Sequence, residues 1–323
     1  MVFTPSYYGT TADVRALAGA CHGRDIPLVT DDAWGLDHTI TDHTDMPASA
    51  LSEGADLVIG SVHKTLTGMS QTSVLSVGSD RIDSDRLKLS FELEESTSMS
   101  AVLLSSIDGA RAQFVRDGRE LLDRAVSSAR LMHERIAAEV PELEVVGTDR
   151  LAALPGVAGV DPTHVLIDTA SIGLSGYKAE DWLRGQRQID VELADHRRIM
   201  PLVSFAHGEE EVDRFVRGLR DLVDAHPDAD DVPHVPRVPR FRAEQAMTPR
   251  EAFFAKTDDV KPSEAAGRVS AEWITPYPPG IPAIAPGEVY TDTAVDYLEE
   301  VVVAGGYLEG ATDQSLGKMR VVA

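Results

Sequence analysis

Short apolar runs alternate with amphipathic stretches along the first half of the sequence. The runs 26–30 and 57–59 have the length and aliphatic composition of buried strands, and 73–77 has the pattern of a further strand. One helix face is predicted from four apolar positions at i, i+3, i+4 and i+7: Val14, Leu17, Ala18 and Cys21. We expect Thr10 or Thr11 to cap this helix. Strands that alternate with helices in this way predict an α/β domain.

The pattern changes after residue 96. Two apolar stripes between residues 96 and 140 predict two helices, one that follows Ser98 and one that begins near Gly118. After Pro141 the apolar runs become shorter, which is typical of a smaller α+β domain. The predicted strands are 143–146, 164–168, 189–193 and 200–205, and the predicted helices lie near 179–185 and over 209–223.

The last third of the sequence follows a proline-rich stretch. Residues 226–240 contain four prolines and a run of acidic residues, and we interpret them as a linker. A Thr-Pro-Arg-Glu sequence that starts at Thr248 has the signature of a capped helix start. Because prolines exclude a helix or a central strand over 276–282, we expect an extended loop there. A helix over 292–303 and a strand over 319–322 complete the chain.

Composition limits the class of protein. The chain has 323 residues, 43% of them hydrophobic, which is enough for two or three cores. The net charge of −23 and the lack of a basic stripe argue against a nucleic-acid ligand and favour cationic ligands. The sequence has neither a run of eighteen apolar residues nor a basic-then-apolar leader, so we expect a cytoplasmic protein with no membrane partner.

The sequence offers little for a disulfide or a metal site. Cys21 is the single cysteine, and we interpret it as a thiol packed on a buried helix face. Residues 35–50 are predicted to form a polar loop that contains Asp37-His38 and Asp42-His43. Because no third ligand follows at a recognisable spacing, we interpret these histidines as solvated and expect no metal.

Two reactive side chains follow the predicted strands. Asp31 ends the first run, and Lys64 comes shortly after the second. The carboxyl ends of strands in an open α/β sheet form a ligand-binding edge. A lysine and an acid at this edge suit pyridoxal 5'-phosphate (PLP), since the amine can form a Schiff base and the acid can pair with the ring nitrogen. Three neighbouring side chains could bind the phosphate: Ser61, His63 and Thr65. From the residues alone, a turn-capping acid and a solvated lysine are equally open readings.

Several motifs together resemble the bacterial ornithine/lysine/arginine decarboxylases. Asp31-Asp32-Ala33-Trp34 followed by Ser61-Val62-His63-Lys64 is similar to their PLP site. The other similar segments are Thr4-Pro5-Ser6-Tyr7-Tyr8-Gly9, Ser96-Thr97-Ser98-Met99-Ser100, 247–254, 276–282 and Pro286-Gly287-Glu288. The resemblance runs from end to end, and the C-terminal segments are its most specific part.

The resemblance implies a fold and a division into domains. The fold would be the PLP-dependent transferase-like α/β fold of aspartate aminotransferase (type I), with an additional α+β C-terminal domain. Residues 1–117 would belong to the PLP-binding large domain and 118–240 to a small α+β domain that ends in the linker. Residues 241–323 would form the C-terminal domain of the family.

The resemblance also implies a reaction. It is the decarboxylation of lysine, ornithine or arginine to the corresponding amine and CO₂, with PLP held by Lys64 as a Schiff base. Asp31 would keep the ring nitrogen protonated, and the small Ala33 would let the ring pack against the strand end. Ser61 and His63 would contact the cofactor, and His63 would help to return a proton to Cα.

The resemblance extends to a partner subunit and has exceptions. Thr97 and Ser98 are expected to reach the cofactor phosphate of a neighbouring subunit, which implies at least a homodimer.

Trp34 stands where many relatives have His, and Met99 stands where Pro is common. Relatives carry a phosphate loop and a ring-stacking histidine before the Tyr-Tyr-Gly motif, and this sequence has no counterpart. We therefore expect the C-terminal portion of a decarboxylase, which binds PLP weakly by itself.

Two other interpretations stay open. The chain could be a non-catalytic fragment or partner subunit of such a decarboxylase. It could also be another fold-type-I PLP enzyme, such as an aminotransferase, although the proline-rich C-terminal unit argues against this reading.

Overall fold

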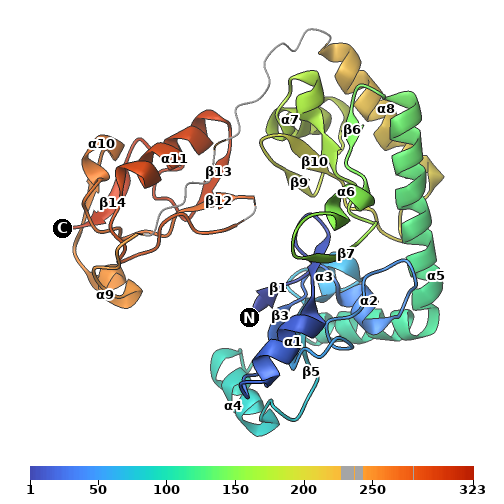
Figure 1. Cartoon of the computed structure of the whole chain (residues 1–323), viewed down its shortest axis with the longest axis horizontal. Coiled ribbons are helices and arrows are strands. Elements are labelled where there is room, and N and C mark those ends of the chain that lie inside the picture. Colours follow the sequence, from blue (N-terminus) through green and yellow to red (C-terminus); the bar gives the residue numbers. More distant parts are fainter. Residues whose placement is uncertain (227–235, 237–242, 279) are drawn as a thin grey trace. The chain divides into compact units, whose positions relative to one another are not determined.

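The computed structural model describes residues 1–226, 236, 243–278 and 280–323 (Figure 1). The chain divides into two compact units, one of residues 1–167 and 200–221 and the other of residues 168–199 and 222–323. The predicted linker over 226–240 lies almost entirely outside the described residues. In the described part of the chain, every helix is too short or too polar to cross a lipid bilayer.

The first unit contains a four-stranded sheet with the strand order β1-β3-β4-β5. Its strands are β1 (Val2–Phe3), β3 (Val29–Asp31), β4 (Leu57–Ser61) and β5 (Ser73–Val77). Strands β1, β3 and β4 are parallel, with Thr30 opposite both Val2 and Val58. Strand β5 is antiparallel to β4. The strand predicted over 73–77 is confirmed, and the two aliphatic runs supply the central strands of the sheet.

Helix α1 (Val14–His22) packs against the sheet through its apolar stripe. The buried cluster consists of Val14, Ala18, Leu28, Ala50, Ala55 and Val58. The predicted cap is wrong: Asp13, not Thr10 or Thr11, caps the helix by accepting a hydrogen bond from the Ala16 amide at 2.9 Å. The two threonines lie instead in β2 (Thr10–Ala12), which pairs with β7 (Val157–Val160). Pairing with β7 keeps them extended, so the helix starts only after Asp13.

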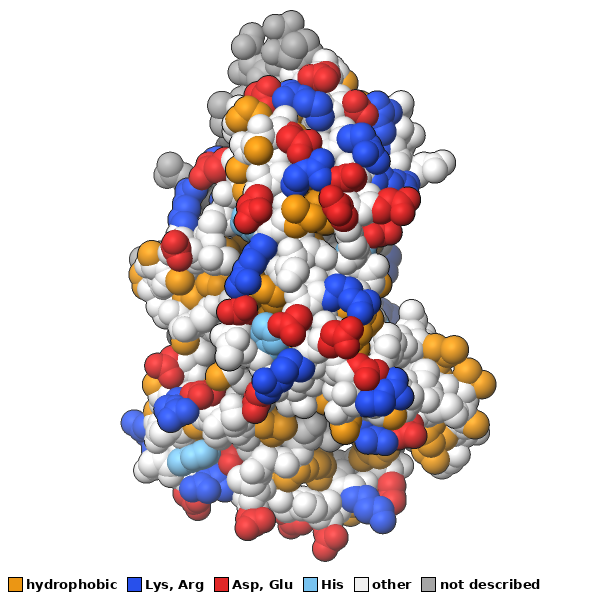
Figure 2. All heavy atoms as spheres, turned by 90° about the vertical axis from the view of Figure 1, so that its right-hand side faces the viewer, with side chains coloured by type: hydrophobic (Ala, Val, Ile, Leu, Met, Phe, Trp, Pro, Cys, Tyr) orange, Lys and Arg blue, Asp and Glu red, His pale blue; other side chains and the backbone are white. Residues whose placement is uncertain are grey.

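Helix α5 (Ala101–Glu139) is one continuous helix of 39 residues, and the prediction of two helices over 96–140 is wrong. The second helix is predicted to begin near Gly118, although glycine is a weak helix former. In the structure Gly118 is buried within the helix, and a Cβ on it would lie 2.3 Å from Thr41 Oγ1. The glycine therefore serves close packing against another segment. Ion pairs such as Arg111–Asp108 and Arg124–Glu120 line the solvent side of α5, where charges of both signs intermingle (Figure 2).

The other face of the first sheet exposes apolar side chains. A cross-strand row on this face consists of Phe3, Asp31, Ile59 and Leu75. Phe3 and Leu75 are exposed, as is Val77 two residues along β5. Asp31 thus lies on the uncovered face, at the carboxyl end of its strand.

Short elements complete the first half of the chain. They are α2 (Leu36–Ile40), α3 (Val62–Thr65) and α4 (Ser84–Glu94).

A second four-stranded sheet has the order β6-β8-β10-β9. Its strands are β6 (Glu144–Val145), β8 (Ile167–Asp168), β9 (Leu193–Ala194) and β10 (Arg198–Met200). The remaining helices of this region are α6 (Thr148–Ala152), η1 (Thr169–Ile172), α7 (Gly176–Arg187) and α8 (Glu209–Ala225).

The predictions for this region hold best for the helices. Helices α7 and α8 confirm the two predicted helices. The strands predicted over 143–146 and 164–168 are shorter than expected, and the strand predicted over 189–193 is wrong before Leu193, where β9 begins. The strand predicted over 200–205 is wrong beyond Met200, because β10 ends there and Pro201, which has no N–H for a ladder, follows.

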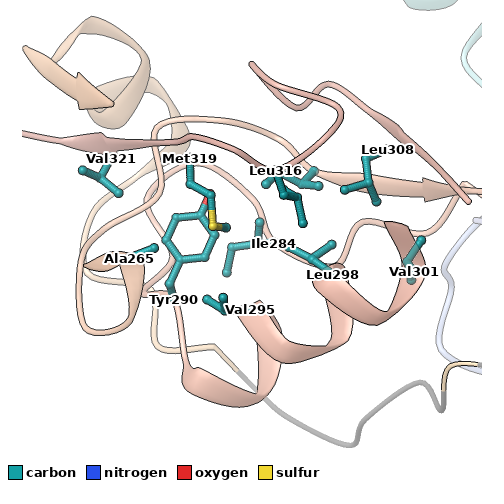
Figure 3. Close-up of a cluster of buried hydrophobic side chains, with 11 residues drawn as sticks. Ala265, Ile284, Tyr290, Val295, Leu298, Val301, Leu308, Leu316, Met319 and Val321 are labelled. Atoms are coloured by element: carbon teal, nitrogen blue, oxygen red, sulfur yellow. The ribbon is translucent and has the colours of Figure 1, made fainter. Parts of the chain in front are cut away.

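The C-terminal residues of the second unit surround their own hydrophobic cluster (Figure 3). The elements are α9 (Pro249–Phe254), β11 (Thr257–Val260), α10 (Pro262–Ala265), β12 (Thr275–Tyr277), α11 (Asp292–Val303), β13 (Tyr307–Glu309) and β14 (Met319–Val322). Strand β11 pairs with β14, and β12 pairs with β13. The capping box at Thr248, the helix over 292–303 and the strand over 319–322 are confirmed. The loop predicted over 276–282 begins as the end of β12.

Tyr290 is a buried member of this cluster (Figure 3), and its hydroxyl is hydrogen-bonded. Ser270 Oγ donates to the hydroxyl at 3.0 Å, and the hydroxyl donates to Glu272 Oε1 at 3.3 Å. Glu272 also accepts hydrogen bonds from the amides of Thr312 and Arg320, both at 2.7 Å. Burial raises the pKa of Tyr290, and Glu272 raises it further. These bonds satisfy polar groups that would otherwise destabilise an apolar core.

Candidate functional site

Two neighbouring parallel strands carry Asp31 and Lys64 to the same edge of the first sheet. Asp31 is the last residue of β3, and its Cα pairs with that of Ile59 in β4. Strand β4 ends at Ser61, and α3 then places Lys64 in the first turn beyond the strand. The sheet topology therefore brings an acid and an amine to the carboxyl edge, where α/β sheets bind ligands.

Asp31 and the next residue have contrasting surroundings. Asp31 is half-buried, and its Oδ1 accepts a hydrogen bond from the Ala33 amide at 3.1 Å, which fixes the carboxylate at the strand end. Asp32 is buried, and its Oδ2 accepts a hydrogen bond from Thr39 Oγ1 at 2.7 Å. Burial raises the pKa of Asp32 to about 7 despite the bond from Thr39. The pair therefore provides a solvent-accessible acid beside a buried one.

Lys64 is half-buried and faces two aromatic rings. Its Nζ lies 4.7 Å from the ring centroid of Trp34 and 5.9 Å from that of Tyr7. The two rings are 5.4 Å apart and tilted by 56°. In the sequence, Tyr7 and Trp34 are members of two motifs and have no predicted role in the site. Their position in two motifs that precede Lys64 is the sequence signal that could have indicated a place in the site.

Three polar residues around Lys64 differ in their freedom to bind a ligand. His63 is exposed, and its Nδ1 donates to the carbonyl of Thr72 at 2.8 Å, which leaves Nε2 as the outward nitrogen. Thr65 Oγ1 is buried without a hydrogen-bond partner among the described residues. Ser61 is half-buried at the end of β4. An unpaired buried hydroxyl is costly and points to a missing polar partner.

Thr97 and Ser98 lie in the exposed segment between α4 and α5. Among the described residues of the chain, neither makes a hydrogen bond to the segments 31–34 or 61–65. The amide of Ser98 donates to Ser96 Oγ at 3.1 Å. Within the described residues of one chain, these two side chains are therefore not hydrogen-bonded to the segment that carries Lys64.

A group of buried acids and histidines lies behind the strand end, and the prediction of a solvated loop over 35–50 is wrong there. Helix α2 turns Asp37 and His38 inward, so that His38 is only 3% exposed. Burial lowers the pKa of His38 and raises that of Asp37 well above its usual range. Asp161 is buried as well, which by itself raises a carboxyl pKa, but His164 and Thr163 outweigh burial and lower it. No group fit to hold a metal ion is found in the part of the chain that the structure describes.

Comparison with protein families identifies two matching regions. Residues 1–154 match the family model described as Orn/Lys/Arg decarboxylase, major domain. Residues 236–310 match the model described as Orn/Lys/Arg decarboxylase, C-terminal domain. Together the two models cover more than half of the chain.

Curated relatives are longer than this chain. An arginine decarboxylase of Halalkalibacterium halodurans is 35% identical over 330 residues, a match that covers 100% of this chain and 65% of the relative. An arginine decarboxylase of Bacillus subtilis is 32% identical over 324 residues, with the same coverage. The chain thus spans just under two thirds of the length of these relatives.

Solved structures share the fold. The constitutive lysine decarboxylase of Escherichia coli matches with a TM-score of 0.78 at 20% identity, covering 100% of this chain and 58% of that one. The ureidoglycine-glyoxylate aminotransferase of Bacillus subtilis matches with a TM-score of 0.53 at 15% identity, covering 70% of this chain and 60% of that one. The predicted aspartate aminotransferase fold (type I) with an additional C-terminal domain is thereby confirmed.

Proposed function

Because the chain belongs to the Orn/Lys/Arg decarboxylase family, we propose that it carries out the PLP-dependent decarboxylation of a basic amino acid. The observation that carries the proposal is the placement of Asp31 and Lys64 at the ends of adjacent parallel strands. Arginine is the first substrate to test, since the relatives above 30% identity include proteins named arginine decarboxylase. The acidic charge of the chain favours cationic substrates of this kind.

The residues present fit the cofactor. When bound, PLP supplies an aldehyde that captures amines and a ring that accepts the electron pair left by a departing carboxylate. Lys64 would hold the cofactor through its amine, and Asp31 would keep a proton on the ring nitrogen. Ala33, small and half-buried, leaves room beside the strand end. The unpartnered Thr65 hydroxyl supports the presence of a phosphate acceptor nearby.

Two further residues of the same segment would assist. Ser61 would contribute a hydrogen bond to the cofactor phosphate. His63 would use Nε2, because Nδ1 donates to the Thr72 carbonyl and so fixes the orientation of the ring. A histidine held in this way can return a proton to the substrate carbon after CO₂ has left.

We also propose that the working form is at least a homodimer. Helix α4 has no buried residue. Apolar side chains on α4, on the segment that follows it and at the start of α5 are exposed: Leu89, Phe91, Leu93, Met99, Val102 and Leu104. Contiguous exposed apolar surface marks an interaction site. Thr97 and Ser98 lie within the same stretch, so a second copy seated there would receive them near its own cofactor.

Leu93→Glu is expected to weaken the dimer. Leu93 is 75% exposed, and a carboxylate at this position would be desolvated in the interface, raising the dimer dissociation constant by about 10- to 100-fold. Sedimentation velocity measures the change. Val303→Glu is the matched control, because Val303 is 84% exposed on α11, outside this stretch. A monomeric parent chain, or equal dimer stability in both variants, would contradict the proposed interface.

The proposed reaction is tested by CO₂ release. The full chain with PLP is incubated with carboxyl-labelled arginine, lysine or ornithine, and labelled CO₂ is counted. We expect release from at least one of the three amino acids, and more from arginine than from the others. Release from none of them, with the chain folded by circular dichroism, would refute the assignment of a decarboxylase activity to this chain.

A further inference from the structure

We propose that Tyr7 and Trp34 form an aromatic corner that holds the ammonium group of Lys64 whenever this amine is not bonded to the cofactor. The two residues would be positioning residues that act through Lys64. Their role in catalysis rests on the proposed function. The contact itself is a property of the chain and is tested without cofactor or substrate.

The geometry is that of a cation against two ring faces. Lys64 Nζ lies within 6 Å of both ring centroids, at 4.7 Å from Trp34 and 5.9 Å from Tyr7. This is the range in which the negative face of an aromatic ring attracts a cation, and Trp gives the strongest attraction of the aromatic side chains. The tilt of 56° between the rings makes a corner instead of a single wall.

Other partners for the charge are lacking nearby. Within the described residues, no carboxylate oxygen lies within 4 Å of Lys64 Nζ. The titratable groups on the neighbouring segments include Asp31, Asp32, His63 and His164, besides Tyr7 itself. The Nδ1 of His63 is committed to Thr72, and the ring of His164 packs edge-on against Trp34. The two rings are therefore the main stabilising contacts of the ammonium.

The Trp34 ring of the corner is restrained by the residues that pack against it. Trp34 is 4% exposed, and His164 meets its ring edge-on at a centroid distance of 5.9 Å and an angle of 76°. The side chain of His164 packs closely against the backbone of Gly9. A Cβ on residue 9 would lie only 2.8 Å from this side chain. The Nδ1 of His164 also lies 3.3 Å from Asp161 Oδ2. Trp34 consequently has little room to turn away from Lys64.

A rigid corner has a use in the proposed reaction. A lysine side chain has four flexible torsions, and a released amine would otherwise sample many positions in solvent. Held against Tyr7 and Trp34, the amine stays at the strand edge as an ammonium ion. Once Nζ has passed one proton to solvent, the neutral amine would attack the cofactor from this position without first searching for it.

Trace acetylation of the full chain tests the contact, because only the neutral amine reacts. Acetic anhydride is the probe, and the acetylation of each lysine is read by peptide mapping. Five lysines serve as internal references: Lys88, Lys178, Lys256, Lys261 and Lys318. At pH 8, Trp34→Leu is expected to raise the acetylation rate of Lys64 about threefold, and Trp34→Phe by less. At pH 11, above the ordinary pKa of a lysine side chain, we expect the difference to fall below about twofold.

Two further variants keep the test decisive. Tyr7→Leu is expected to raise the rate at pH 8 about twofold, and it carries the test if Trp34→Leu does not fold. Trp182→Leu is the matched control, since Trp182 faces Arg187 at 5.0 Å elsewhere in the chain and should leave Lys64 unchanged. Unchanged rates at pH 8 would overturn the proposal. A threefold difference between the Lys64 acetylation rates of variant and parent that persists at pH 11 would also overturn the proposal. The ring would then block access of the reagent to the amine instead of stabilising its charge.

The outcome is independent of the proposed decarboxylation. If the acetylation test failed, the proposed role of Tyr7 and Trp34 would be refuted. The proposed decarboxylation would still be open to test by CO₂ release. Conversely, a chain that releases no CO₂ could still show the predicted acetylation pattern.

Discussion

Lys64→Ala is expected to lower the rate of CO₂ release by at least about a thousandfold. In the proposed reaction the Lys64 amine holds the cofactor at the sheet edge, and the variant lacks the only group that does so covalently. The structure supports this choice because Lys64 follows β4 directly and is half-buried. The measurement is the initial rate of CO₂ release at saturating PLP, with kcat and KM determined separately.

Lys256→Ala is the control for this variant. Lys256 is an exposed lysine in the second unit, and we expect its removal to leave kcat within about twofold, as is usual for a surface substitution. If Lys64→Ala kept its activity within tenfold of the parent chain, Lys64 would not be the cofactor-binding residue. The assignment of the site would then have to move elsewhere.

Asp31→Asn is expected to lower kcat by roughly a hundredfold or more. The amide cannot hold a proton on the ring nitrogen as a carboxylate does, so the ring accepts electrons less readily. The fold should be retained, because Asn keeps an oxygen that can accept the hydrogen bond from the Ala33 amide. Activity assays and PLP titration of the same preparation separate an effect on kcat from an effect on cofactor affinity.

The adjacent acid provides an internal control. Asp32→Asn changes a carboxyl one residue away that is buried and hydrogen-bonded to Thr39. The pKa of Asp32 is raised to about 7 by burial, so near neutral pH this group already carries only part of its charge. We expect a change in kcat of less than about fivefold at pH 7. Equal losses in the two variants would contradict the distinct role given to Asp31.

Local sequence signals predicted the elements that depend on local chemistry. The strand over 73–77, the helix over 292–303 and the strand over 319–322 match the structure in their bounds. The capping box at Thr248 also forms as expected. Asp31 and Lys64 were identified because each follows an aliphatic run, and parallel strands bring such positions to one edge.

The errors have a different physical origin. The sequence pattern predicts that a second helix begins near Gly118, yet this glycine permits α5 to pack closely against Thr41, which is 77 positions away in the sequence. His38 was expected in solvent, yet α2 turns it into the interior. Asp13 replaced the predicted threonine caps because β2 pairs with a distant strand. In each case a tertiary contact overrode a local preference.

The aromatic corner was beyond sequence reasoning for the same reason. Tyr7, Trp34 and Lys64 belong to three separate segments, and only the folded chain shows that the two rings face the amine. The roles of all the proposed site residues stay predictions: Asp31, Ala33, Ser61, His63, Lys64, Thr97 and Ser98. The division into the domains 1–117, 118–240 and 241–323 stays a prediction as well.

The most direct test of the account is to locate the covalent attachment of PLP. The full chain is incubated with PLP, reduced with borohydride, digested and mapped by mass spectrometry. The account predicts one modified lysine, Lys64, with the five other lysines unmodified at stoichiometric PLP. Modification of a different lysine, or spread evenly over all six, would contradict the placement of the site at the ends of β3 and β4.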